Sequence, residues 1–348
     1  MMALLKKYLF SVPALGIALL ICTAGALFFG AFGTGIREIG QAFYALGYSE
    51  EPDLSSYLIL HIRLPRILLA GLTGAGLAVA GAAIQGLFRN PMADPSLIGV
   101  TGGAMLFAVG SIVLMGALSS HLTGFLQQAS IAVFAFAGGL ATTYAVYFLS
   151  RYQGRTQVMT MLLAGIAITA LTGAVAGFFI YISNEQQLRD ITFWSLGSFS
   201  GSDWPGFLIA GPVIIAGFVV LIKAARPLNA LLLGEKEAVS MGFRVERIKT
   251  RIILVTALIV GVCISISGII GFVGLVIPHF LRLIRGTDYR YLMKASALLG
   301  AVFLILTDTL ARTIIAPAEL PIGILTAIVG APFFLWLLIR SRQDRLTL

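Results

Sequence analysis

The chain has 348 residues, of which 58% are hydrophobic and only 11% are charged. Soluble domains carry about 25% charged residues, so this composition excludes an ordinary soluble fold and predicts a polytopic membrane protein. The formal net charge of +9 indicates cytoplasmic loops that face anionic lipid rather than a nucleic-acid partner. The two cysteines, Cys22 and Cys263, lie inside apolar runs, so we expect neither a disulfide nor a metal site from them.

The N-terminus places two lysines before an uncharged run over residues 8–36. This run is much longer than the apolar core of a signal peptide, which has about 7–15 residues. We therefore interpret it as a retained first membrane span.

A helix needs about 20 predominantly apolar residues to cross a bilayer. Such runs predict an all-α membrane protein with ten spanning helices, and the whole chain, 1–348, is expected to form one transmembrane domain. The expected spans are 9–34, 65–87, 95–115, 124–149, 157–183, 205–223, 248–267, 272–286, 291–311 and 321–339.

The uncharged segment 95–150 is too long for one crossing. A polar cluster at 119–124 predicts a turn in its middle, so the segment is interpreted as two spans. The uncharged run 252–281 is followed closely by basic residues, and Gly268, Gly271 and Gly274 interrupt it. We expect a short, tilted eighth helix after this break. The alternative is one long tilted helix.

Charge predicts the orientation of the spans. If both termini are cytoplasmic, all but five of the 24 Lys and Arg fall in cytoplasmic segments, as the positive-inside rule requires. The five exterior residues are Arg37, Arg63, Arg66, Arg189 and Arg312. The acidic loop SEEPD, residues 49–53, also falls outside.

Residues 226–251 form the longest strongly charged stretch, and they are either a connector or a docking surface. No phosphate-binding loop, metal-ligand spacing of histidines or nucleophile–base pair is apparent, so an enzyme is not expected. The spans hold almost no ionisable residues except Asp308. Arg312 lies one helical turn after Asp308 and is expected to neutralise it. Energy for transport must then come from a separate cytoplasmic ATPase. The alternative is a carrier or channel that works without an ATPase, and it would need a buried charge array.

The second expected span also contains several glycines. Gly74, Gly76 and Gly81 lie within its apolar run and are expected to allow close packing between helices.

Several motifs resemble the FecCD family, the permease subunits of ATP-driven importers for vitamin B12, ferric siderophores and haem. The matching stretches are RLPR at 63–66, GLFRNPMADPSLIG at 86–99, LLLGEKEAVSMG at 231–242, GFVGLVIPHFLRLIRGTDYR at 271–290 and APAELPIGILTAIVGAPFFLWLL at 316–338.

The resemblance implies a type II ABC importer permease fold with ten helices per subunit. It also implies a homodimer with the pathway at its interface, two ATPase subunits and one periplasmic binding protein, in the bacterial inner membrane. The permease itself would bind no cofactor, because ATP and Mg act on the ATPase. The tail and the 86–95 loop look most similar to haem permeases, and siderophore or cobalamin import remains the alternative.

The family's ATPase-coupling helices correspond to about residues 226–247. The motif positions are Gly234, Glu235, Ala238 and Gly242. Glu235 and Glu237 fall in the first turn after Gly234, where negative charge suits a helix N-terminus. Gly242 is placed to end that helix in a left-handed conformation.

The other family roles fall on the remaining motifs. Arg63, Arg66 and Arg312 resemble outer-face contacts to the binding protein, with lipid-headgroup anchoring as the alternative for the first two. The residues matching the cytoplasmic gate are Asn90, Met92, Val158 and Met159. The pathway candidates near its outer mouth are Phe178, Arg189 and Trp194, for which plain packing or another docking contact is the alternative.

Overall fold

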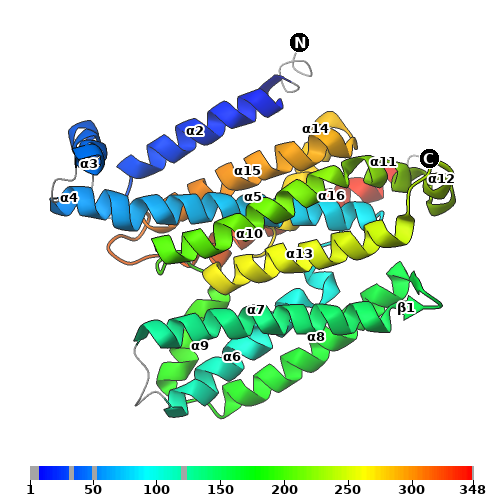
Figure 1. Cartoon of the computed structure of the whole chain (residues 1–348), viewed down its shortest axis with the longest axis horizontal. Coiled ribbons are helices and arrows are strands. Elements are labelled where there is room, and N and C mark those ends of the chain that lie inside the picture. The colour runs from blue at the N-terminus through cyan, green and yellow to red at the C-terminus, as the bar shows by residue number, and fades with distance from the viewer. Residues whose placement is uncertain (1–7, 31–34, 49–52, 119–123, 347–348) are drawn as a thin grey trace.

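The computed structural model describes residues 8–30, 35–48, 53–118 and 124–346. The elements are α2 (Val12–Phe28), α3 (Ile36–Tyr48), α4 (Leu54–Tyr57), η1 (Leu58–Arg63), α5 (Leu64–Leu87), η2 (Pro95–Ile98), α6 (Val100–Leu118), α7 (Gly124–Leu149), β1 (Arg151–Tyr152), β2 (Arg155–Thr156), α8 (Val158–Tyr181), α9 (Glu185–Leu196), α10 (Trp204–Lys223), α11 (Ala225–Leu233), α12 (Glu235–Ser240), α13 (Val245–Ser267), α14 (Val273–Arg285), α15 (Tyr289–Ala311) and α16 (Ile322–Leu346). The long helices lie side by side, with α3, α4 and α9 at one end and α11, α12 and the β1–β2 hairpin at the other (Figure 1). We call these the α4 end and the α12 end.

Each of the ten expected spans has its own helix. Within the described residues, six helices are long and apolar enough to cross a membrane, and three shorter apolar helices lie at 12–28, 100–114 and 322–337. The tenth is α14. The first span is shorter than expected, because α2 ends at Phe28 and not near residue 34. The expected turn at 119–123 lies outside the described residues, but separate helices α6 and α7 flank it.

The break in the run 252–281 is confirmed, and the alternative of one long helix is wrong. Helix α13 ends at Ser267, and Gly268 and Phe272 both have φ near +68° before α14 begins. With 13 residues, α14 is only about 20 Å long, short of a hydrocarbon core of about 30 Å. At the break before it, the backbone N–H of Ser198 donates to Ser267 O, at the end of α13, at 2.8 Å.

Helix α5 forms the centre of the larger group of helices and packs against α10, α13, α14 and α15. Glycine allows the closest of these approaches. A Cβ added at Gly74 would overlap the carbonyl oxygen of Gly300 on α15, and one at Gly81 would overlap Gly274 on α14. The expected close-packing role of these glycines is confirmed.

A smaller group, α6, α7 and α8, lies beside the first and joins it mainly where α7 packs against α13 (Figure 1). Among the six membrane-length helices, α8 is the least buried, and large apolar side chains cover its exposed face. These include Met159, Leu163, Ile166, Leu171 and Phe178.

Several local elements of the described residues were not expected, among them α3, α9 and the β1–β2 hairpin. Helix α3 follows the first span, and α9 follows α8, where Asn184 and Gln187 form a reciprocal capping box. The β1–β2 hairpin pairs Arg151 with Thr156 and Tyr152 with Arg155. Gln153 and Gly154 both have positive φ at its turn, as a two-residue hairpin loop favours.

Candidate functional site

The α11–α12 segment forms two short helices, as the sequence predicted. Gly234 separates them with φ 147° and ψ 156°, a conformation that L-residues rarely adopt. Glu235 and Glu237 then occupy the first turn of α12. Gly242 has φ 85° and ends the helix in a Schellman motif, in which Phe243 N–H donates to Ala238 O and Gly242 N–H donates to Val239 O. The expected start and end of α12 are confirmed.

The two helices differ in what they bury and expose. Ala238 is fully buried against the rest of the chain, so it fixes α12 in place and offers no surface. The exposed apolar side chains of the segment are Leu232, Leu233, Val239 and Met241. Together with the exposed Glu235, Lys236 and Glu237, they give this end a mixed apolar and charged surface of the kind that receives a protein partner.

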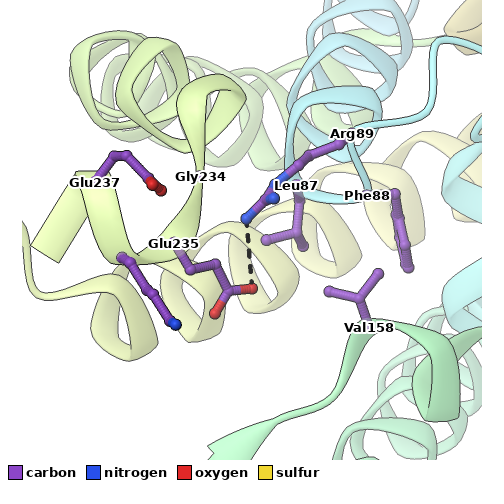
Figure 2. Close-up of a pocket in the computed structure, with 8 residues that line it drawn as sticks. Leu87, Phe88, Arg89, Val158, Gly234, Glu235 and Glu237 are labelled. Carbon is purple, nitrogen blue, oxygen red and sulfur yellow. Dashed lines mark ion pairs between the residues drawn. The ribbon is translucent and has the colours of Figure 1, made fainter.

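A cleft of about 470 Å³ separates α12 from the end of α5 and the start of α8. Its lining residues are Leu87, Phe88, Arg89, Val158, Gly234, Glu235, Lys236 and Glu237. Figure 2 shows Arg89 and Glu235 directed toward each other across this cleft, with their side-chain N and O atoms 3.7 Å apart. The cleft therefore brings together Glu235, a residue expected to couple to the ATPase, and Val158, a residue expected to form the gate.

Lys249 binds Glu235, one of the residues that line this cleft, and was not singled out from the sequence. It is 3% exposed on α13, and its Nζ donates to Glu235 Oε2 at 2.9 Å, Glu246 Oε1 at 3.0 Å and Thr156 O at 3.2 Å. Thr156 N–H donates in turn to Glu246 Oε2 at 2.8 Å. One buried ammonium thus joins α12, α13 and the hairpin that leads into α8.

A second link connects α11 to the start of α15. Asn229 Nδ2 donates to Asp288 Oδ1 at 2.7 Å, and Tyr289 N–H donates to Asn229 Oδ1 at 2.9 Å. The hydrogen bonds from Asn229 and from the Arg290 backbone N–H hold the pKa of Asp288 below its ordinary value.

The expected gate residues occupy two neighbouring segments. Asn90 is exposed and accepts a hydrogen bond from Met92 N–H in the loop after α5, whereas Val158 and the exposed Met159 begin α8. Of these four, Val158 lines the cleft. His279 of α14 lies 3.3 Å from Pro91 O and so fixes the same loop from the other side.

The three expected docking arginines gather at the α4 end, but all three are buried. Arg63 Nη1 donates to Leu27 O and Arg312 Nη2 donates to Ala26 O, both at 2.8 Å. These carbonyls lie in the last turn of α2, where a helix has unpaired acceptors and favours positive charge. Two of the arginines therefore hold the end of α2.

Asp308 has a partner that the sequence did not indicate. The expected ion pair with Arg312 is present, with 3.7 Å between Arg312 Nε and Asp308 Oδ2. Arg66 is closer, because its Nη2 lies 2.8 Å from Asp308 Oδ1 and its Nε donates to the same carboxylate. The other side of the Arg66 guanidinium binds Glu319 at 2.8 and 3.0 Å.

The pathway candidates lie on α8 and α9. Phe178 is exposed near the end of α8 and Trp194 is half-buried on α9. Arg189 is also exposed, and its Nη2 donates to Gln186 Oε1 at 3.0 Å. Within the described residues, no group of three or more His, Cys, Asp or Glu side chains is arranged to hold a metal ion.

The fold and the sequence match known transporters. A solved metal-chelate type ABC transporter in an inward-facing conformation has a TM-score of 0.79 and 32% sequence identity, over 94% of this chain and 98% of that one. The hemin transport system permease protein HmuU of Yersinia pestis is 42% identical over 96% of this chain and 98% of its own length. The cobalamin import system permease protein BtuC of Halobacterium salinarum is also 42% identical, over 84% of this chain and 76% of its own length.

The fold and the matches define a multi-pass permease subunit of an ABC importer, with the type II importer fold. Such a subunit is not itself catalytic, because a separate ATPase partner uses the ATP. A model of the FecCD transport family matches residues 18–340, so the chain belongs to the FecCD transport family.

Proposed function

We propose that this permease imports haem. The observation that carries the proposal is the match to the hemin permease, which spans nearly all of both chains, whereas the cobalamin permease of equal identity spans a smaller part of each. The apolar exposed face of α8 suits a flat, largely apolar macrocycle. Phe178 and Trp194 would contact its ring, and Arg189 would bind a propionate by a charge-assisted hydrogen bond.

Liposomes that contain the permease and its ATPase test the cargo. Binding proteins loaded with haem, cobalamin or a ferric siderophore are added in turn, and ATP hydrolysis and cargo uptake are measured. We expect only the haem-loaded protein to stimulate both. Stimulation by a siderophore-loaded or cobalamin-loaded protein alone would show that the haem assignment is wrong.

The proposed assembly is a homodimer with two ATPase subunits and one periplasmic binding protein, in a bacterial inner membrane. The α12 end is cytoplasmic in this arrangement, with both termini on that side. The hydrogen bond from Tyr291 Oη to Phe10 O supports this, because it fixes the residues before α2 near the start of α15, which in turn binds α11.

The ATPase docks on α11–α12 in this proposal, at Gly234, Glu235, Ala238 and Gly242. Because Ala238 is buried, the cross-linking site of choice is the neighbouring Val239, which is 59% exposed. We expect Val239→Cys to cross-link to the ATPase. Gly242→Pro is expected to abolish coupled transport without loss of insertion or dimerisation, because proline cannot adopt positive φ. Failure of Gly242→Pro to insert would instead show that the segment is only structural.

The gate and docking roles complete the proposal. Asn90, Met92, Val158 and Met159 would close the cytoplasmic end of the pathway. Arg63, Arg66 and Arg312 would meet acidic residues of the binding protein. Since the Arg66 donors are occupied within the chain, an acidic partner would reach Arg66 by replacing Glu319, its more exposed acceptor.

A further inference from the structure

Lys249 carries a buried positive charge, and docking of the ATPase on the exposed surface of α11–α12 does not by itself require one. An ammonium taken out of water is costly unless it is paired and its donors are satisfied. Lys249 satisfies all three of its donors with Glu235, Glu246 and Thr156 O, none of them longer than 3.2 Å. The cost is therefore offset only while these three partners stay together.

The three partners come from parts of the chain with different roles. Glu235 begins α12, where we place the ATPase. Glu246 lies one turn before Lys249 on α13. Thr156 ends the hairpin and lies two residues before Val158, the first residue of α8.

The attachments differ in strength. Thr156 is fixed to α13 at two points, because its carbonyl accepts from Lys249 and its N–H donates to Glu246. Glu235 is attached through one carboxylate whose side chain is 45% exposed and which Arg89 also approaches, at 3.7 Å. A bond that served only to hold the hairpin on α13 would not include this exposed residue of α12. Glu235 lies between two cations. Lys249 is bonded to Thr156, just before α8, and Arg89 follows the end of α5. Figure 2 shows Arg89 on the opposite side of the cleft from Glu235.

We propose that Lys249 is a positioning residue that transmits displacement of α12 to the hairpin and so to the gate-forming start of α8. The inference rests on the proposed docking of the ATPase at α12. When the ATPase moves α12, Glu235 moves the Lys249 ammonium, and Thr156 follows because it is bonded to Lys249 and Glu246. The ammonium has three rotatable donors, so it keeps its partners through such a movement.

The test uses the complete transporter in liposomes, with Lys249→Met in the permease. This variant is expected to fold, because Glu235 and Glu246 are exposed enough to be hydrated when the ammonium is absent. Cargo uptake per ATP hydrolysed should fall about tenfold, because the variant loses hydrogen bonds between charged groups, which are the strong ones. Basal ATP hydrolysis should stay within about twofold. Lys249→Arg should recover much of the lost uptake. Lys294→Met, which removes an exposed lysine of α15 outside the coupling segment, is the matched control and should leave uptake unchanged.

A distance measurement separates transmission from simple stabilisation. Spin labels at Lys236→Cys and Gln153→Cys, both exposed, report the separation of α12 and the hairpin in a variant that lacks Cys22 and Cys263. With Lys249, the separation should stay constant between nucleotide-free and ATP-bound states. With Lys249→Met, it should change with nucleotide.

The outcomes are distinct for the two proposals. Absence of a Val239→Cys cross-link in an otherwise wild-type permease would overturn the docking proposal, and the inference would fail with it. A normal cross-link with unchanged uptake per ATP in Lys249→Met would overturn only the inference. Loss of ATPase binding in Lys249→Met would also overturn it, because Lys249 would then only shape the docking surface.

Discussion

Each end of the helix bundle buries long basic side chains next to carboxylates, but the two clusters are built differently. At the α4 end, Arg66 binds Asp308, whose side chain is 1% exposed, and also Glu319. At the α12 end, both carboxylates that Lys249 binds are at least one-third exposed. The Arg66 cluster thus contains two further buried charges, Asp308 and the Arg312 that pairs with it, whereas Lys249 is the one buried charge among the described residues of its cluster.

The chemistry of the two cations matches this difference. The guanidinium of Arg66 is a planar fork whose donors meet two carboxylates in a fixed geometry. The ammonium of Lys249 is a point charge on a flexible stem and accepts partners in changing directions. Arg66 is suited to hold α5, α15 and the segment before α16 in one arrangement. Lys249 is suited to keep its partners while they move.

The largest expected effect is that of Arg66→Met. It leaves the Asp308 carboxylate buried, and among the described residues Arg312, 3.7 Å away, is its one remaining cationic partner. Removal of one partner of a buried ion pair costs about 3–5 kcal/mol, so a marked fall in Tm is expected. Thermal unfolding in detergent measures it, with Glu319→Gln as a control that removes only the exposed partner's charge. Equal Tm values for the two variants would contradict a special role for the buried carboxylate.

Arg66→Met combined with Asp308→Leu should recover most of that loss. Replacement of a buried ion pair by apolar residues is often neutral or stabilising by about 1–4 kcal/mol. The same unfolding assay compares the double variant with the single one. A double variant as unstable as Arg66→Met would mean that the buried Arg312, 3.7 Å from Asp308, also depends on that carboxylate.

Lys249→Met should cost much less stability than Arg66→Met, about 1 kcal/mol, because the carboxylates it leaves behind reach water. Thermal unfolding of the two variants side by side gives the comparison directly. A loss for Lys249→Met as large as that for Arg66→Met would show that the α12 end is as rigidly held as the α4 end.

The comparison also shows what the sequence could predict. The ten spans and the break at Gly268 follow from apolar runs and their interruption, and the ends of α12 follow from Gly234 and Gly242. Helices α3 and α9 were missed because they are short and more polar than the spans. The hairpin has only two residues in each strand, too few for a periodic pattern.

The candidate site was predictable only where its parts are close in sequence. The pair Asp308 and Arg312 was visible because its members lie one helical turn apart. Arg66 and Asp308 are separated by 242 positions, and Lys249 and Thr156 by 93, so no local pattern links them. In both cases a basic residue near a helix end gave no indication of the distant groups that the fold brings to it.

The smallest expected effect is a pH dependence at Asp288, which accepts from Asn229 and so helps to attach α11 to the start of α15. Because its pKa is lowered from an ordinary value of 3.8, the folded state favours the ionised carboxylate, and this contribution is fully present above that value. It is lost as the pH falls through the folded-state pKa.

In Asp288→Asn the side chain still accepts from Arg290 N–H but does not titrate. The Tm of the wild-type chain should therefore fall relative to that of Asp288→Asn between pH 5 and pH 3, a window set by the ordinary carboxylate pKa of about 4. All other carboxylates titrate in both proteins and cancel in the difference. A constant difference across this range would show that Asn229 binds the neutral and the ionised side chain equally, and that α11 is held to α15 by shape rather than by charge.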